Sequence, residues 1–385
     1  MRFAAFSDIH YADYSTGVSV DDVAGVERAV TDHCLQNSIK WCVFCGDRYL
    51  SHEPQDYVRV ISDREQKYRN DQGVVTFSLV GNHDLYAKAP VSGHSNRHLQ
   101  TIWNDTLRNI VVMDEVKTYR HPDVPNVAVH SIPACYDWSE GMLDRFDFQP
   151  NEFNLLVFHD MLKGSVLDHT TNYQAPKGQR IELIDDARFH LVLGGDVHLP
   201  QRLAFQKTNG GYVGACIQQS RRDRGNSRGW LDVTVDGTVL RGNAQHIESP
   251  SPRFLDASWD FDHDGKDLPT AQDIARKIDE GYGDTAQGNI VDIILTGARE
   301  QLEAVPADWH RKLQAELQAK RINAPMKRGK ADVPMMRRAV TVAAQKAPLE
   351  DLQAFLSSGR ASLDGNDPER LLAKAAPVLA HVAGK

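Results

Sequence analysis

The chain has 385 residues, of which 41% are apolar and 25% charged, a composition that excludes a disordered protein and allows two or three compact units. Its formal charge of 44 minus 52, or −8, excludes recognition of nucleic acid by overall charge, so such a role would need local basic patches. No apolar run approaches the roughly 18 to 20 residues of a membrane helix, no signal peptide follows Met1, and five scattered cysteines suit a reducing compartment, so we expect a soluble, cytoplasmic protein.

Apolar runs and helical periodicity alternate through the first 200 residues. Short runs rich in Val, Phe and Leu are typical of strands buried on both faces of a sheet. We expect such strands at 2–7, 41–45, 74–80, 109–113, 127–132, 154–158 and 189–194. Amphipathic stretches between the first of them predict helices at 20–36 and at 54–69, the second with Pro54 as its first residue. The alternation predicts an α/β layered domain.

The pattern changes after Asp196. Shorter strands separated by Gly-rich turns are expected at 202–206, 212–217 and 230–234, as in an antiparallel second sheet. Two prolines within 249–252 indicate a linker. Beyond it, the sequence predicts a helix at 270–280, a strand at 289–295, a helical stretch at 299–320 and two short amphipathic helices after residue 349. This is enough for a small α+β module followed by a helical tail.

Short polar motifs follow five of the apolar strands. They are Asp8 with His10, Gly46–Asp47, Gly81–Asn82–His83–Asp84, His159, and Asp196 with His198. Taken singly, such residues are usually solvent-exposed turn or capping residues. Their ordered repetition favours a shared site, because packing gives no reason for five buried strands to end in ligand-type residues, and strand carboxyl ends converge in open α/β sheets. Carboxylate, imidazole and amide oxygen suit two divalent ions, and Asp47, central in the order, is the natural bridge between them.

These motifs resemble the pattern D-x-H, G-D, G-N-H-D, H and G-H-x-H of the calcineurin-like metallophosphoesterases. The resemblance implies an α/β fold with a four-layer α-β-β-α sandwich. It also implies one metal ion on Asp8, His10, Asp47 and His198, and a second on Asp47, Asn82, His159 and Asp196. His83 would face the scissile phosphate, and Asp84 would orient His83 or fix its loop. The chain departs from the family at Asp196, where the pattern has a histidine, and the carboxylate would favour a harder metal there.

Within the superfamily, residues 210–230 and the module after the linker resemble the SbcD-type nuclease subunits of double-strand-break repair. The implied function is a DNA exonuclease or endonuclease that hydrolyses phosphodiester bonds by a two-metal mechanism in repair and recombination. Two ions are expected, with Mn²⁺ preferred over Mg²⁺, Fe²⁺ or Zn²⁺. The implied domains are a catalytic domain at 1–248, a DNA-binding α+β cap at 253–330 and a partner-binding helical tail at 331–385. The implied partners are DNA, an SbcC-like coiled-coil ATPase and a second copy of the chain.

Several residues outside the metal motifs are candidates for the same reaction. The subfamily has a histidine three residues after the Gly-Asp aspartate, where this chain has Leu50, and we expect His52 to take that catalytic role. The basic run after residue 220 could contact the DNA backbone, although such a run is more often a solvated face. Its arginines are Arg221, Arg222, Arg224 and Arg228.

Two other functions stay open on the sequence alone. The same site could serve a phosphomonoesterase or a cyclic-nucleotide phosphodiesterase, which would need no DNA cap. Alternatively, Asp196 could mark a decayed site in a binding or scaffold subunit, against which the other intact motifs speak.

Overall fold

The computed structural model describes residues 1–85, 98–100, 106–134, 136–168, 173–236, 239–240, 244–323 and 325–329. It divides the chain into two units, Met1–Leu255 with Gly288–Ile290 and Asp256–Gln287 with Val291–Lys385. The expected tail at 331–385, with its two helices, lies outside the described residues. Within the described part, no helix has the length and apolar character needed to span a bilayer.

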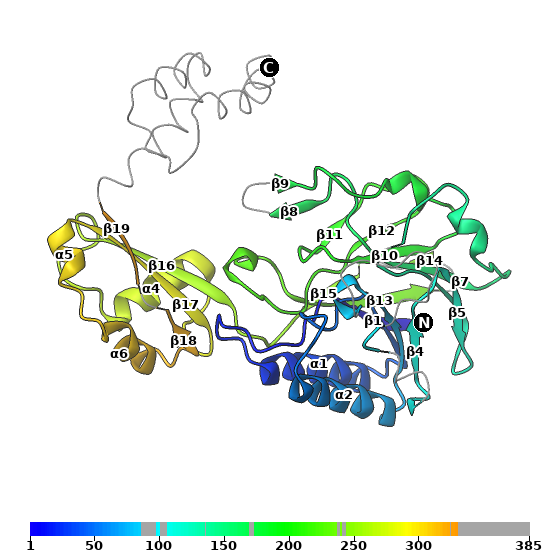
Figure 1. The fold of residues 1–385 in the computed structure, drawn as a ribbon, viewed down its shortest axis with the longest axis horizontal. Helices are drawn as coiled ribbons and strands as arrows, with labels where there is room; N and C mark the ends of the chain where they lie inside the picture. The colour runs from blue at the N-terminus through cyan, green and yellow to red at the C-terminus, as the bar shows by residue number, and fades with distance from the viewer. Residues whose placement is uncertain are drawn as a thin grey trace, which may run out of the picture. The chain divides into compact units, whose positions relative to one another are not determined.

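The first unit contains a seven-stranded mixed sheet (Figure 1). Its strands, in spatial order, are β14 (Val239–Leu240), β13 (Gly229–Asp236), β1 (Arg2–Phe6), β2 (Trp41–Phe44), β3 (Val75–Leu79) and β4 (Ile110–Met113), and β15 (Gln245–Glu248) also pairs with β13. Strands β1 to β4 are parallel, and β13 runs antiparallel to β1. The carboxyl ends of β1, β2 and β3 therefore meet at one edge of the sheet.

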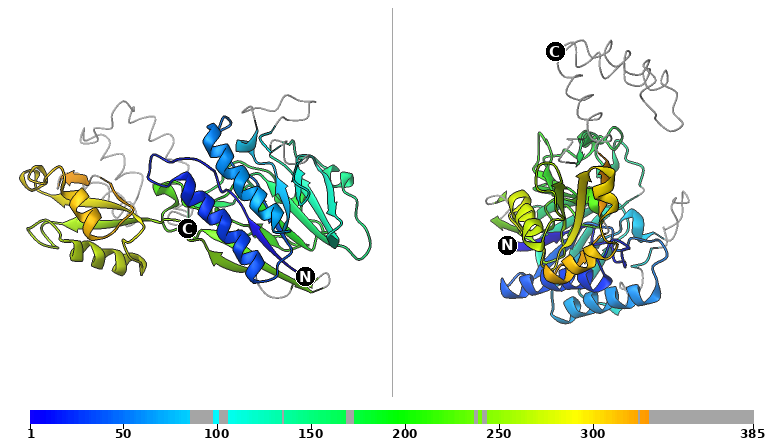
Figure 2. Two further views of the ribbon diagram at one scale, coloured as in Figure 1. Left: turned by 90° about the horizontal axis from the view of Figure 1, so that it is seen from below. Right: turned by 90° about the vertical axis from the view of Figure 1, so that its left-hand side faces the viewer.

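Helices α1 (Val20–Gln36) and α2 (Asp56–Asp71) lie side by side against one face of this sheet (Figure 2). A capping box between Ser19 and Asp22 starts α1, and its apolar stripe packs in one core cluster with Phe6 and Phe44. The bounds of α1 are those predicted from periodicity. Helix α2 begins at Asp56 instead of Pro54, because Gln55 keeps an extended backbone as its N-cap.

The second sheet has six strands and faces the first. Its order is β11 (Gln201–Arg202), β12 (Gly210–Tyr212), β10 (Leu191–Gly195), β7 (Phe153–His159), β6 (Val124–Ile132) and β5 (Lys117–His121). Strands β6, β7, β10 and β12 are parallel. One core cluster joins Phe3, Val43 and Phe77 of the first sheet to Leu155 and Leu193 of the second, so the central strands β1, β2, β3, β7 and β10 are buried on both faces as their composition predicted.

The strands that follow Asp196 do not form an antiparallel sheet of their own. Strands β11 and β12 extend the second sheet, whereas β13, β14 and β15 extend the first. The prediction of a separate second sheet after residue 196 was wrong because strand pairing is non-local. Strand β13 pairs with β1, at the other end of the unit's sequence, and local patterns contain no information on that partner.

The outer face of the second sheet also differs from the four-layer prediction. In the described part of the chain it is covered by the 3-10 helices η2 (Met142–Arg145) and η3 (Ile181–Leu183) and by the hairpin β8 (Val166–Asp168)–β9 (Tyr173–Gln174), not by α-helices. The covering segments contain repeated prolines and glycines, which interrupt helical hydrogen bonding. Large aromatic side chains from these turns pack on Leu156 and Phe158 instead.

The second unit is a small α+β fold. Strands β16 (Phe254–Asp260), β17 (Ile290–Gly297), β18 (Arg321–Ile322) and β19 (Met326–Gly329) form its sheet. Helix α4 (Ala271–Tyr282) starts at a capping box of Thr270 and Asp273 and ends at Gly283 in the left-handed conformation. The single helical stretch expected at 299–320 is two helices, α5 (Arg299–Glu303) and α6 (Trp309–Glu316), with Pro306 between them.

Candidate metal centre

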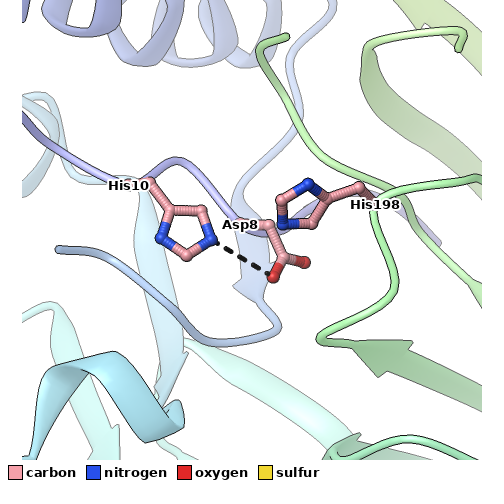
Figure 3. Close-up of side chains that lie close together, drawn as sticks. All are labelled: Asp8, His10 and His198. Carbon is pink, nitrogen blue, oxygen red and sulfur yellow. Dashed lines mark ion pairs between the residues drawn. The ribbon is translucent and has the colours of Figure 1, made fainter. Parts of the chain in front are cut away.

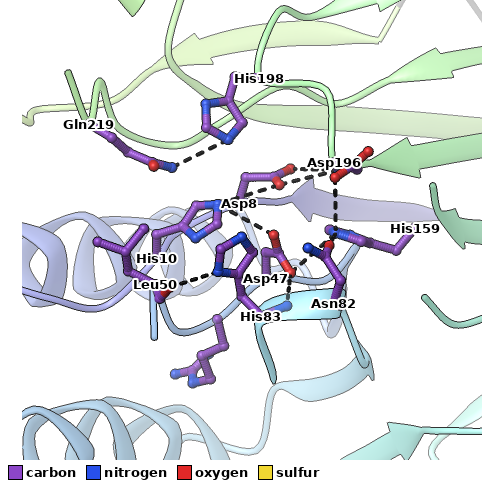
Figure 4. A network of polar contacts seen from close by, with 12 residues as sticks. Asp8, His10, Asp47, Leu50, Asn82, His83, His159, Asp196, His198 and Gln219 are labelled. Atoms are coloured by element: carbon purple, nitrogen blue, oxygen red, sulfur yellow. Dashed lines mark hydrogen bonds and ion pairs between the residues drawn. The ribbon is translucent and has the colours of Figure 1, made fainter. Parts of the chain in front are cut away.

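The five predicted motifs lie together where strands of both sheets end (Figure 4). Asp8 and His10 follow β1, Asp47 follows β2, and the 3-10 helix η1 (Asn82–Asp84) follows β3. His159 ends β7, and Asp196 and His198 follow β10. Main-chain hydrogen bonds join neighbouring loops, from the Asp8 amide to the Gly46 carbonyl at 3.0 Å and from the His10 amide to the Asp47 carbonyl at 3.1 Å. The topology therefore brings residues 188 positions apart into one cluster.

Four of these residues have a left-handed backbone conformation. The φ angles are 50° at Asp8, 46° at His10, 60° at Asp47 and 82° at Asp196. This conformation is uncommon for residues other than glycine and costs free energy wherever it occurs. Each left-handed residue turns the chain sharply just after its strand, which aims the side chain into the cluster.

Two glycines let the loops approach each other closely. A Cβ atom on Gly46 would lie 2.3 Å from His159 Nδ1, and one on Gly195 would lie 2.2 Å from the Cys45 carbonyl oxygen. Gly46 also has a φ of 104°, which side-chain-bearing residues rarely adopt. The glycine in the Gly46–Asp47 motif is thus required by the packing of the site.

Three histidines have Nδ1 next to an oxygen atom of the protein, which leaves Nε2 for the centre of the site. His10 Nδ1 lies 3.3 Å from the Tyr49 carbonyl oxygen, and His159 Nδ1 lies 2.7 Å from that of Cys45. His198 Nδ1 lies 3.3 Å from Asp223 Oδ1. Because these oxygens only accept hydrogen bonds, each Nδ1 carries a proton and Nε2 is left to bind a ligand.

A first group of possible metal ligands consists of Asp8, His10 and His198 (Figure 3). Their ligand atoms all lie within 4.8 Å of one another, and Asp8 and His10 are fully or almost fully buried. His10 Nε2 lies 3.7 Å from Asp8 Oδ1 and 3.5 Å from Asp47 Oδ2, yet it has no hydrogen-bond partner in the described part of the chain. A buried ring nitrogen left in this way next to two carboxylates fits a cation between them.

A second group consists of Asp8, Asp47 and His159. His159 Nε2 lies 3.2 Å from Asp47 Oδ1 and 3.0 Å from Asn82 Oδ1. Asp47 thus faces His10 with one oxygen and His159 with the other, an arrangement that allows its carboxylate to bridge two ions. Asp196 lies at the rim of this group, with Oδ1 4.0 Å from His159 Nε2 and its side chain 26% exposed.

The electrostatics of the cluster also fit divalent cations. Burial disfavours the charged form of Asp8 and Asp47, but the neighbouring histidines outweigh it and lower the pKa of both carboxyls. Burial raises the pKa of Asp196 to about 6, with Asp8 and Asp47 adding to the effect and His159 opposing it. Against the effect of burial, the same carboxylates raise the pKa of His159 and that of His198, so a bound cation could take the place of the protons that balance the buried carboxylates.

Two further histidines lie side by side at the centre. The rings of His52 and His83 are parallel, with an interplanar angle of 2° and centroids 5.6 Å apart, and both are half-buried. His83 Nδ1 donates to the Leu50 carbonyl at 2.7 Å, and His52 Nδ1 donates to that of Leu85 at 2.8 Å. The structure thus places His52 next to His83, although it is two residues later in the chain than the subfamily's histidine.

Asp84 is fully buried and binds main-chain amides of two loops. Its Oδ1 accepts from the amides of Arg48 at 2.8 Å and Tyr49 at 3.2 Å, and its Oδ2 accepts from the amide of Gly81 at 3.0 Å and from Gln100 at 2.8 Å. Of the two roles expected for Asp84, these contacts fit that of fixing the loops after β2 and β3.

The four arginines predicted to contact DNA lie in different environments. Arg221 is exposed and Arg224 is half-buried, next to the 3-10 helix η4 (Arg221–Asp223), while the side chain of Arg222 lies outside the described part. Arg228 is 7% exposed and donates to the Ser251 carbonyl at 2.7 Å and to Glu248 at 2.7 Å. These contacts hold Arg228 inside the fold, which does not suit a DNA contact.

Sequence reasoning missed the contacts of Asp223 and Gln219 with His198. Asp223 lies inside a run of arginines, which was interpreted only as positive charge. The spacing Ser220-x-x-Asp223 is that of a capped turn, and it was the signal available for this residue.

Comparison with known proteins gives one family match. The model of the calcineurin-like phosphoesterases matches residues 1–200. Among solved structures, the chain is similar to a dimetal phosphatase from Danio rerio, with 11% identity over 65% of this chain and 97% of that one and a TM-score of 0.41. It is also similar to the phosphopantetheinyl hydrolase of Mycobacterium tuberculosis, with 14% identity over 55% and 89% of the two chains and a TM-score of 0.32.

Proposed function

The chain belongs to the calcineurin-like phosphoesterase family and is thus a metal-dependent phosphoesterase, and we propose that the ester it hydrolyses is the phosphodiester bond of DNA, as in an SbcD-like nuclease. The observation that supports DNA best is the loop with Arg221 and Arg224, which Asp223 fastens to His198 at 3.3 Å. Positive charge fixed beside a phosphoesterase site favours a polyanionic substrate over a small phosphate ester.

The proposed cofactors are two divalent ions, with manganese preferred. One would be held by Asp8, His10, Asp47 and His198, and the other by Asp47, Asn82, His159 and Asp196. When bound, such ions neutralise phosphoryl oxygens and supply a nucleophile at neutral pH.

The chain's own residues would carry the proton and hold the substrate. His83 is fixed through Nδ1 to Leu50, so a second proton, carried on Nε2 in the imidazolium form, would pass to the departing sugar oxygen and leave the ring neutral. His52, stacked in parallel on His83, would bind a phosphate oxygen. Asp84 would act as a positioning residue, because all of its contacts hold loops in place.

The proposal is tested with a linear, end-labelled DNA duplex and manganese, comparing the wild type with Asp47→Ala and His83→Ala at low and moderate salt. We expect degradation in the wild type, none in Asp47→Ala, and a rate about 10²- to 10⁴-fold lower in His83→Ala. His33→Ala is the control and should cleave like the wild type, since His33 on α1 pairs with Asp232 on β13 and neither residue belongs to a metal-ligand group. Turnover of p-nitrophenyl phosphate without DNA cleavage would refute the nuclease and favour the phosphomonoesterase.

The proposed assembly follows from the sequence resemblance. We propose that residues 253–330 are a DNA-binding cap, that residues 331–385 bind an SbcC-like ATPase, and that the chain pairs with a second copy. Light scattering of the full chain tests the dimer. Co-purification with a coiled-coil ATPase, with and without residues 331–385, tests the tail, and equal recovery of both forms would refute its role.

A further inference from the structure

The loop after β12 contacts both ring nitrogens of His198. His198 Nδ1 lies 3.3 Å from Asp223 Oδ1. His198 Nε2 lies 3.4 Å from the side-chain amide nitrogen of Gln219 (Figure 4). A carboxylate only accepts and an amide nitrogen only donates, so both contacts fit the tautomer with its proton on Nδ1 and its lone pair on Nε2. That tautomer binds a metal ion through Nε2.

Asp223 is itself held by the loop that carries the arginines. Its second oxygen, Oδ2, accepts from the amides of Gln219 and Ser220, both at 3.0 Å, and the residue is 9% exposed. One oxygen is therefore committed to the loop backbone and the other to His198. The carboxylate cannot turn away from the ring without losing two main-chain hydrogen bonds.

We propose that Asp223 is a positioning residue that keeps His198 in the metal-binding tautomer and makes the arginine-bearing loop, residues 220–224, part of the support of the metal centre. The inference rests on the proposed function only in that the site takes divalent ions. Its consequence is that the ion held by His198 depends on the placement of the same loop that would meet the substrate backbone.

A loop cap with no effect on the metal is the alternative, and the chain offers a matched control for it. Asp185 is also 9% exposed and accepts from the amides of Gln206 and Lys207, both at 2.8 Å. It is not a member of either ligand group among the described residues. Replacing Asp185 therefore measures what the loss of a loop-capping carboxylate does by itself.

The decisive variant is Asp223→Asn. Its oxygen can still accept from the two loop amides, which turns the new NH₂ group toward His198 Nδ1. Two donors then face each other unless the ring moves its proton to Nε2, and that tautomer cannot bind a metal through Nε2. Asp223→Ala lets water replace the carboxylate and imposes no wrong tautomer, but it removes the cap.

The measurements are calorimetric titration of the metal-free full-length chain with Mn²⁺ and thermal unfolding without metal. We expect Asp223→Asn to lower the affinity for one of the two ions by about 10- to 100-fold, which is more than Asp223→Ala does. Asp223→Asn should nevertheless unfold at a higher temperature than Asp223→Ala. Asp185→Asn should keep both affinities. A cap with no effect on the metal predicts the same order of unfolding temperatures, but it leaves the manganese affinity of both Asp223 variants at the wild-type value.

Wild-type manganese affinity in Asp223→Asn would overturn the inference, as would a wild-type chain that binds no manganese. Should Asp223→Asn fail to fold, Asp223→Ala against Asp185→Ala decides the question, since only the former should lose metal affinity. DNA is absent from the titration, so a wild-type chain that binds manganese but does not cleave DNA would refute the nuclease and leave this result standing.

Discussion

Replacing Glu27 with glutamine would test how far the metal centre depends on the charges buried beneath it. The Glu27 carboxylate on α1 is fully buried and accepts hydrogen bonds from Arg48 Nη2 at 2.8 and 2.6 Å and from Arg69 Nη2 at 2.7 Å. The Tyr11 hydroxyl donates to it at 2.6 Å. Arg48 directly follows Asp47, so this cluster supports the loop that carries the bridging carboxylate.

The expected magnitude follows from the two guanidiniums that the variant would leave behind. Burial would raise the pKa of Glu27, but the charges of Arg48 and Arg69 outweigh it and lower that pKa, so the carboxylate is ionised at neutral pH. Removing one partner of a buried ion pair costs about 3 to 5 kcal/mol, because the other charge stays in the interior. At about 2 to 4 °C per kcal/mol for a unit of this size, the melting temperature should fall by about 6 to 20 °C.

Scanning calorimetry of the full chain at pH 7 measures this loss, and Glu65→Gln is the control. Glu65 pairs with Arg28 and Arg64, which are 39% and 57% exposed, so its replacement should cost about 1 kcal/mol or less. Because the folded-state pKa of Glu27 lies below the unfolded value, its stabilisation is present above that value and should fade as the pH falls below about 4. A Glu27→Gln chain that melts with the wild type would refute the reasoning.

Three further predictions concern other parts of the first unit. Gly46→Ala would place a Cβ 2.3 Å from a metal-site histidine, so it should cost at least about 1 kcal/mol and abolish manganese binding by calorimetry. Gly25→Ala on α1, where the space is open, is its control, and equal behaviour would contradict the packing argument. Burial lowers the pKa of His130 to about 4, so the unfolded chain takes up a proton first on acidification, and about 3 kcal/mol of stability should be lost between pH 6.5 and 4. Urea unfolding should show a flatter pH dependence in His130→Gln, and an unchanged slope would exclude this histidine as the cause. Arg228→Ala should destabilise the fold by about 1 to 3 kcal/mol, whereas Arg221→Ala should keep stability and reduce the salt dependence of DNA binding by about one unit of slope. The reverse result would exchange the roles assigned to the two arginines.

The central part of the fold could be predicted because its signals are local. The bounds of α1 follow from Ser19, Asp22 and the apolar stripe, and the parallel strands follow from short runs of Val, Phe and Leu. Strand β5 was missed because its sequence, Lys117–His121, is polar and it lies at the edge of its sheet. The joining of β13 to β1 could not be predicted, since pairing is decided by the packed sheet and not by either strand.

The candidate site was predictable in its members but not in its supports. Polar residues at five strand ends are visible in the sequence, and the structure brings them together. Their supports are main-chain carbonyls, such as those of Cys45 and Tyr49, and every residue has a carbonyl, so sequence offers no signal for them. The inward role of Arg228 was missed for a similar reason, because its partners lie about 20 residues away in the chain.

The left-handed backbone at Asp8, His10 and Asp47 has a consequence for the life of the protein in the cell. The ligand positions are set when the chain folds, so an ion that arrives later needs no large rearrangement and should exchange quickly. An ion that binds only this native arrangement also shifts the folding equilibrium by mass action, by about 2.7 kcal/mol at a hundred times its dissociation constant. The supply of divalent metal would then set the lifetime of the protein as well as its turnover, and metal starvation would remove it by unfolding and proteolysis.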